Sequence, residues 1–132
     1  MGLENYNIVD IENALTAKLK TLNITANLYP SVRPAVVVST GMTEFLVIRT
    51  STDVSDLGAH GRLMTVIEIY TKNAGNLPNR SRISSIRNTI TAALPYSSDK
   101  FSYSYFTETP LSQDGNGYTF QMIKLITILK RF

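Results

Sequence analysis

Apolar side chains occupy both odd and even positions in two segments, residues 62–72 and 118–131, and this pattern restricts the fold more than any other feature. Successive side chains of a strand point to opposite faces of a sheet, so each segment predicts a strand that is apolar on both faces. The opposing sets are Leu63, Ile67 and Ile69 against Met64, Val66 and Tyr70, and Ile123, Leu125 and Leu129 against Phe120, Met122, Ile126 and Ile128. Such strands need cover on both sides, either from a sandwich-like arrangement within the chain or from a neighbouring subunit.

Two other segments have the period of an amphipathic helix. Their apolar residues recur at steps of three or four, which places them on one stripe of each helix. The stripes are Ile8, Ile11, Leu15, Leu19 and Leu22 in the first segment, and Ile83, Ile86, Ile90 and Leu94 in the second. Asn7 is the expected N-cap of the first helix, and Pro95 is expected to end the second.

The remaining strands are predicted from runs of β-branched and aromatic residues between turn residues. They cover residues 24–29, 35–39 and 43–52. Pro30 and Pro34 fix a bend between the first two, and "QDGNG" joins the alternating "KFSYSYFTE" to the last strand as a hairpin. The predicted fold is α+β, a single domain over residues 1–132 with two helices packed on a mainly antiparallel sheet, in the order α-β-β-β-α-β-β.

Composition excludes several kinds of chemistry. The chain has no cysteine, which excludes disulfides, thiolate catalysis and cysteine-ligated metals. Its 13 basic and 10 acidic side chains give a net charge of +3 and are scattered along the chain. The tightest cationic group, Arg80, Arg82 and Arg87, is interpreted as a solvated helix face. We expect neither a membrane span nor a secretory signal, because no apolar run is long enough and the start is acidic.

The only histidine lies in "DLGAHGR" at residues 56–62, between two glycines. A Ser-His-Asp triad could use His60 with Asp53 or Asp56, but the chain has no Gly-x-Ser-x-Gly motif. Asp53, Asp56 and His60 also form too sparse a set for a known metal-binding pattern. We therefore expect no catalytic, cofactor or metal site, and interpret the protein as not an enzyme.

The histidine stretch is better explained as part of a connection between two strands. From Thr52 to Gly61 this connection runs about ten residues, which is longer than a tight hairpin needs. Long ordered connections in compact domains often serve binding. We expect an interaction loop formed by Asp56, Leu57, His60 and Arg62.

The whole layout resembles a family of phage proteins. Its parts are a first helix "IENALTAKLKTL", then "YPSVRPAVVVST", then the strand–loop–strand unit "FLVIRTSTDVSDLGAHGRLMTVIEIYTK". A second helix "SRISSIRNTITAAL" and a closing strand "YTFQMIKLITILKRF" follow. Over nearly its full length the chain is similar to the small tail-terminator and tail-completion proteins of tailed bacteriophages, of the minor tail protein U type, and to related head–tail joining proteins.

The resemblance implies a virion structural protein of the tail or neck, present in the host cytoplasm during assembly. Tail terminators form a homo-oligomeric ring, commonly a hexamer, that caps the tail tube and docks to the head-side connector. Joining proteins form related rings beneath the portal. The implied partners are therefore copies of this chain, the tail tube protein and portal-associated proteins, with DNA only passing through the lumen and no membrane.

Two other functions are left open by the residues. One is a small nucleic-acid-binding module that uses the arginine helix and the aromatic "FSYSYF" hairpin. The other is a small hydrolase or isomerase built around His60. The first predicts binding that weakens steeply with salt, and the second predicts loss of activity on replacing His60.

Overall fold

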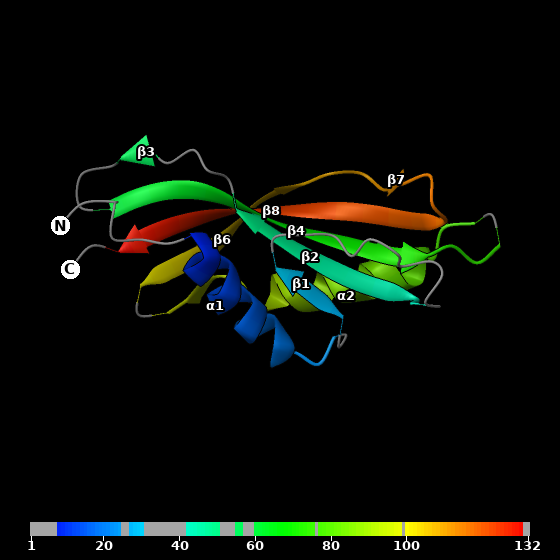
Figure 1. The fold of residues 1–132 in the computed structure, drawn as a ribbon, viewed down its shortest axis with the longest axis horizontal. Coiled ribbons are helices and arrows are strands. Elements are labelled where there is room, and N and C mark those ends of the chain that lie inside the picture. The colour runs from blue at the N-terminus through cyan, green and yellow to red at the C-terminus, as the bar shows by residue number, and fades with distance from the viewer. Residues whose placement is uncertain are drawn as a thin grey trace.

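The computed structural model describes residues 8–24, 27–30, 42–50, 55–56, 60–75, 77–98 and 100–130. Its elements are α1 (Ile8–Lys20), β1 (Leu28–Pro30), β2 (Glu44–Thr50), β3 (Ser55–Asp56), β4 (His60–Lys72), α2 (Arg80–Ala92), β5 (Tyr96–Ser97), β6 (Phe101–Glu108), β7 (Ser112–Gln113) and β8 (Tyr118–Lys130). Both helices lie on one side of a mainly antiparallel sheet, the lower side in Figure 1. This arrangement confirms the predicted α+β class and its order of elements, to which β3, β5 and β7 add short strands.

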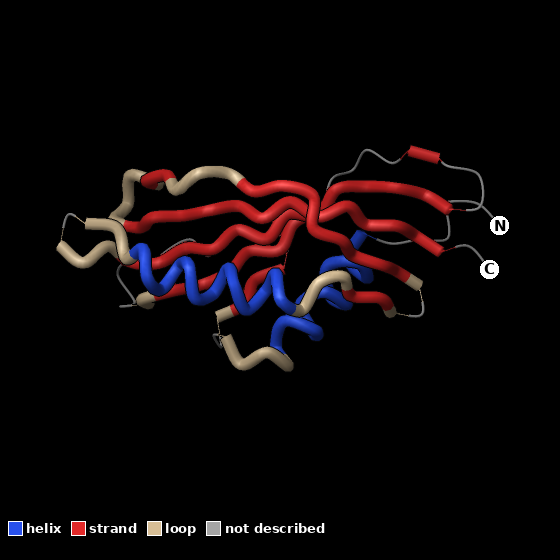
Figure 2. The backbone as a smooth tube through the Cα atoms, turned by 180° about the vertical axis from the view of Figure 1, so that it is seen from behind, coloured by secondary structure: helices blue, strands red, loops and turns tan. Residues whose placement is uncertain are grey.

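The centre of the sheet is formed by β4 and β8. The strands lie in the order β1-β2-β4-β8-β6-β5, with β3 paired to β4 and β7 paired to β8. β4 and β8 are antiparallel along their full length, from His60 opposite Lys130 to Lys72 opposite Tyr118. The long strands of Figure 2 therefore include the two segments that the sequence marked as apolar on both faces.

The first strand differs from its prediction. β1 is Leu28–Pro30 rather than residues 24–29, and it pairs with β2 in the parallel direction. Proline cannot donate to a ladder, but β1 ends the order of the described strands, and an edge strand tolerates proline. The strand predicted at 35–39 and the N-cap predicted at Asn7 lie outside the described residues.

The second helix forms as its sequence predicts. Asn79 caps it, since its side chain accepts a hydrogen bond from the backbone N–H of Arg82 at 3.4 Å. α2 ends at Ala92, before Pro95. Its stripe of Ile83, Ile86 and Ile90 is buried, so packing against the sheet compensates for a helix whose serine and threonine content gives it weak intrinsic propensity.

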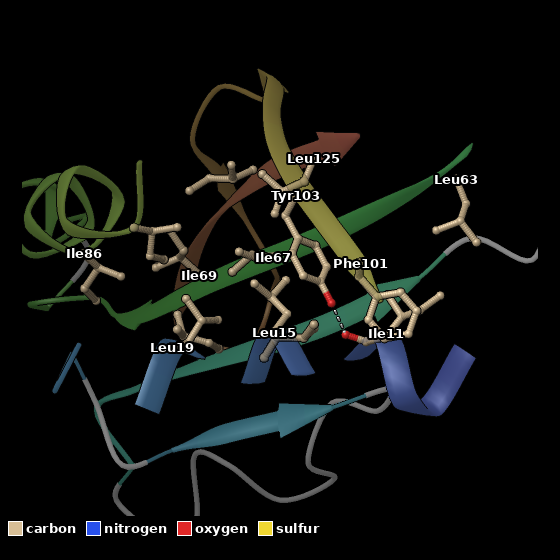
Figure 3. Packing of buried hydrophobic residues seen from close by; sticks show 14 of the residues in the cluster. Ile11, Leu15, Leu19, Leu63, Ile67, Ile69, Ile86, Phe101, Tyr103 and Leu125 are labelled. Atoms are coloured by element: carbon tan, nitrogen blue, oxygen red, sulfur yellow. Dashed lines mark hydrogen bonds between the residues drawn. The ribbon is translucent and has the colours of Figure 1, made fainter. Parts of the chain in front are cut away.

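The main core lies between the helices and one face of the sheet (Figure 3). It joins Ile11, Leu15 and Leu19 of α1 and the isoleucines of α2 to Leu63, Ile67 and Ile69 of β4 and Ile123, Leu125 and Leu129 of β8. Tyr103 of β6 is fully buried among them, and its hydroxyl donates a hydrogen bond to the carbonyl oxygen of Ile11 at 2.7 Å. One face of each two-faced strand is thus covered by the helices.

The predicted tight turn is confirmed between β7 and β8. Gly115 and Gly117 have φ of +82° and +91°, a region that glycine enters without the steric cost of a Cβ. The carboxylate of Asp114 accepts hydrogen bonds from the backbone N–H groups of Asn116 and Tyr118, at 2.7 and 3.1 Å. The turn sets the register in which β8 pairs with β7, with Gln113 opposite Thr119.

Candidate interaction surface

The face of the sheet opposite the helices, here called the outer face, is covered within the chain at one end. A second cluster of Phe45, Val47, Tyr70 and Tyr118 is buried there, with Tyr29, Met42 and Phe120 packed against it. The rings of Phe45 and Tyr70 stack at 4.4 Å between centroids, with an interplanar angle of 7°. At this end of the sheet, the second apolar face of the strands is covered within the chain, which was the first of the two alternatives left open by the sequence.

A buried carboxylate borders this aromatic cluster. Glu68 on β4 is 5% exposed, and it accepts a hydrogen bond from the hydroxyl of Tyr70 at 2.8 Å. The guanidinium of Arg49, on the neighbouring strand β2, forms an ion pair with the same carboxylate. Half of the Arg49 side chain stays exposed, so the buried anion is balanced by a cation that reaches the surface.

Beyond Glu68 the outer face is apolar but less well covered. Its side chains there are Met64 and Val66 of β4 and Ile126 and Ile128 of β8, all half-buried, and we call them the outer strip. Met64 lies directly opposite Ile126. Only serines face the strip from β6, since Ser104 lies opposite Ile126 and Ser102 opposite Ile128. The strip is thus a band of apolar side chains whose cover within the described part of the chain is incomplete.

Cations surround the outer strip. Arg62 is exposed and lies opposite Ile128, and the half-buried Lys124 lies opposite Val66. Arg49 lies opposite Val66 from the other side. The sequence analysis did not single out Arg49 or Lys124, although their spacing from Val47 and Ile126 would have placed them on the outer face.

The predicted interaction loop has a different local structure. His60 and Arg62 belong to β4 rather than to a loop, and Asp56 belongs to β3, where it pairs with Gly61. β3 pairs with the first residues of β4, and the ladder with β8 extends β4 to His60. Leu57 lies outside the described residues. The structure brings Asp56, His60 and Arg62 together at the end of the sheet that carries the outer strip.

The arginine helix agrees only in part with the solvated face that was expected, because Arg80 is exposed whereas Arg82 and Arg87 are half-buried and paired with acids. Arg82 donates two hydrogen bonds to the carboxylate of Glu44, both at 2.8 Å, and one to the carbonyl oxygen of Ile24. Arg87 pairs with Glu108, the closest approach being 2.6 Å. The bond to Glu44 raises the pKa of Arg82, and the bond to Arg87 lowers the pKa of Glu108. Both arginines are paired with acids of the sheet, which makes these two side chains poorly suited to binding phosphate groups.

No catalytic or metal-binding constellation is evident in the described part of the chain. Within the described ranges, no three histidine or carboxylate side chains gather closely enough to hold a metal ion. Asp53, which the sequence analysis considered with His60, lies outside them. Of the helices that the structure describes, none is long and apolar enough to cross a lipid bilayer.

Comparison with known proteins finds similarity at the level of the fold. No protein-family model matches the chain, and no curated protein matches its sequence. Among solved structures, a chain from the virion of a native gene transfer agent (GTA) particle superposes with a TM-score of 0.54 and 14% identity, over 94% of this chain and 92% of that one. A second structure, known only by a sequence code, superposes with a TM-score of 0.56 and 10% identity, over 92% of both chains. The fold is therefore shared over nearly the whole length.

Proposed function

We propose that the chain is a virion structural protein that forms a ring at the head–tail junction of a phage-type particle, where it caps the tail tube as a tail terminator. The observation that carries this proposal is the fold shared with a GTA virion chain over 94% of this chain. The sequence layout, which resembles phage tail terminators, adds to it. In this reading the protein has no catalytic role, and its surfaces serve assembly with copies of itself and with its neighbours in the particle.

The outer strip supports a role in assembly. Met64, Val66, Ile126 and Ile128 form one band on the face opposite the two described helices. In a closed ring each subunit contacts two neighbours through two different surfaces, so apolar surface must be available beyond the core. An obligate interface of this kind buries roughly 2,000 Å² or more. The strip and its rim of Arg49, Arg62 and Lys124 provide one such surface.

The ring is tested on the protein itself. Light scattering after size exclusion, and native mass spectrometry at tens of micromolar, should show a closed oligomer, with a hexamer as the expected number. Because a terminator can close its ring on the tube end alone, the protein is also mixed with tail tubes of the same particle and imaged in negative stain. A protein that is monomeric in solution and absent from tube ends contradicts the proposal.

A head–tail joining ring beneath the portal is the alternative within the same class. The two differ in the surface to which the ring binds. A terminator added to assembling tube protein should stop growth and give tubes of limited length with one end capped. A joining ring should leave tube length unchanged and bind purified portal-containing heads instead.

A further inference from the structure

The turn between β4 and α2, at the right-hand end of Figure 1, presents an apolar side chain to solvent. This side chain is Leu77, which is 70% exposed, the highest value among the large apolar side chains of the described ranges. A single exposed leucine needs no explanation by itself. Leu77 becomes informative because its backbone is fixed by hydrogen bonds and because a cleft of matching character lies elsewhere on the same chain.

The backbone of Leu77 is held from both sides of the turn. Its N–H donates to the carbonyl oxygen of Ala74 at 3.2 Å, and its carbonyl oxygen accepts the N–H of Ala74 at 2.9 Å. Gly75 has a φ of +66°, which glycine adopts without the steric cost of a Cβ. Pro78 follows with a φ fixed by its ring, and Asn79 then caps α2. A backbone fixed in this way loses little conformational freedom when its side chain binds a partner.

A cleft of about 420 Å³ lies between β6 and the second half of α2, and it is lined by Arg87, Thr91, Leu94, Pro95, Ser104 and Tyr105. The charged member of this lining, Arg87, is paired with Glu108, and the hydroxyl of Tyr105 donates to the same carboxylate at 2.7 Å. Leu94, Pro95 and the ring of Tyr105 supply apolar surface. The cleft therefore suits an uncharged, apolar side chain.

The cleft adjoins the outer strip at β6. Ser104 lines the cleft, and it also lies opposite Ile126 of the strip. Phe106, two residues further along β6, is 51% exposed. The strip, the side chain of Phe106 and the cleft are thus neighbouring parts of one acceptor surface, which continues the surface that the proposed ring already uses.

We propose that Leu77 of one copy inserts into this cleft of the next copy, an inference that rests on the proposed ring. Leu77 and the cleft both expose apolar groups, so the contact removes apolar area of both copies from water. Leu77 precedes α2, and the rise of an α-helix places Thr91 roughly 15 Å further along its axis. Donor and acceptor are therefore different surfaces, and the contact is head-to-tail, as a ring needs.

The first test places a charge on Leu77. Leu77→Asp would bury a charge without a partner in the cleft, so native mass spectrometry should show at least tenfold less ring. Leu77→Met keeps an apolar side chain, and Val9→Asp places the same charge at another exposed position, so both should form rings like the wild type. Circular dichroism checks that each variant folds. A folded Leu77→Asp protein that assembles like the wild type, in solution or on tube ends, overturns the inference.

The second test does not depend on the aspartate variant. The chain has no cysteine, and Ala74 pairs with Leu77 across the turn, so Ala74→Cys combined in turn with Thr91→Cys or Ser104→Cys introduces one defined pair. Oxidation of the assembled ring should give a ladder of covalent multimers on a non-reducing gel for at least one pair. Ala74→Cys combined with Val9→Cys is the control and should give no ladder.

The outcomes of the second test separate the contact from the ring. A ring that forms without any ladder, or with an equal ladder for the control pair, overturns the contact at Leu77 and leaves the proposed function standing. Failure of the wild type to form rings, even on tube ends, contradicts the proposed function itself.

Discussion

The carboxylate of Glu12 on α1 accepts a hydrogen bond from the backbone N–H of Thr50, the last residue of β2, with 2.7 Å between Oε2 and the nitrogen. Glu12 is 3% exposed, and the carbonyl oxygen of the same residue accepts the hydroxyl of Thr16. The side chain of Glu12, which lies in the buried stripe of α1, thus joins α1 to the end of β2 through a hydrogen bond. It also satisfies a backbone donor that would otherwise be left without a partner at the strand end.

Replacement of Glu12 should show how much its hydrogen bond to Thr50 contributes to the stability of the fold. Glu12→Ala leaves the N–H of Thr50 without its acceptor and should lower the free energy of unfolding by about 1–3 kcal/mol. Glu12→Gln keeps an acceptor oxygen and should cost less than Glu12→Ala. Urea denaturation followed by circular dichroism measures both. Equal stability of wild type and Glu12→Ala would mean that this bond contributes nothing to the fold.

A second bond from α1 predicts a smaller effect. Tyr103→Phe removes the hydroxyl that donates to Ile11 and keeps the ring in the core, so we expect a loss of about 0.5–1.5 kcal/mol in unfolding free energy. Tyr96→Phe is the matched control, because Tyr96 stacks on Tyr103 and its hydroxyl makes no hydrogen bond with the described residues. Thermal and urea unfolding should rank the control close to the wild type. The reverse ranking would contradict the assignment.

The same tyrosine predicts a dependence on alkaline pH. Burial raises the pKa of Tyr103 above its ordinary value of 10.0, with a further contribution from Tyr96. Above pH 10 the unfolded chain therefore releases this proton while the folded chain retains it, so stability falls as pH rises. Tyr103→Phe lacks this proton and should lose stability less steeply above pH 10. Urea midpoints from pH 8 to 11 measure the difference, and parallel curves would exclude the effect.

On the acid side, the pair of Arg87 and Glu108 should determine part of the stability. Hydrogen bonding to Arg87 lowers the pKa of Glu108 below 4.5, so its contribution is fully present above that pH and is lost as pH falls through the lowered value. Glu108→Gln should flatten the decline in melting temperature below pH 4.5. Arg87→Gln should flatten it similarly, and the double variant should add little. Additive effects of the two changes would show that the residues act separately.

Local periodicity explains how far the sequence predicted the fold. The stripe from Ile11 to Leu19 and the two-faced pattern of 62–72 depend on neighbours along the chain, so both helices and both central strands were predicted from them. Strand pairing depends on residues far apart in the sequence. Neither the parallel pairing of β1 with β2 nor the extension of β4 to His60 has a local signal.

The ion pairs of the second helix also depend on residues far apart in the sequence, so they could not be predicted from local patterns. The sequence places Arg82 and Arg87 on one helix, but their partners Glu44 and Glu108 lie 38 and 21 residues away. Two of the three arginines that the sequence places on this helix are thereby paired with acids of the sheet. The outer strip was predictable in composition from the even positions of β4 and β8, whereas its incomplete cover follows from which face the helices occupy.

The last prediction distinguishes core from interface with one kind of change at two positions. Ile67 is fully buried in the main core, so Ile67→Asp buries a charge without a partner and should prevent folding. Ile126 lies in the half-buried outer strip, so Ile126→Asp should leave a folded protein with a lowered melting temperature that no longer forms rings. Ile126→Val is the control and should both fold and assemble. Circular dichroism reports folding, and native mass spectrometry reports assembly. A ring formed by Ile126→Asp would show that the strip faces solvent in the assembled particle, whereas failure of this variant to fold would place Ile126 in the core of the single chain.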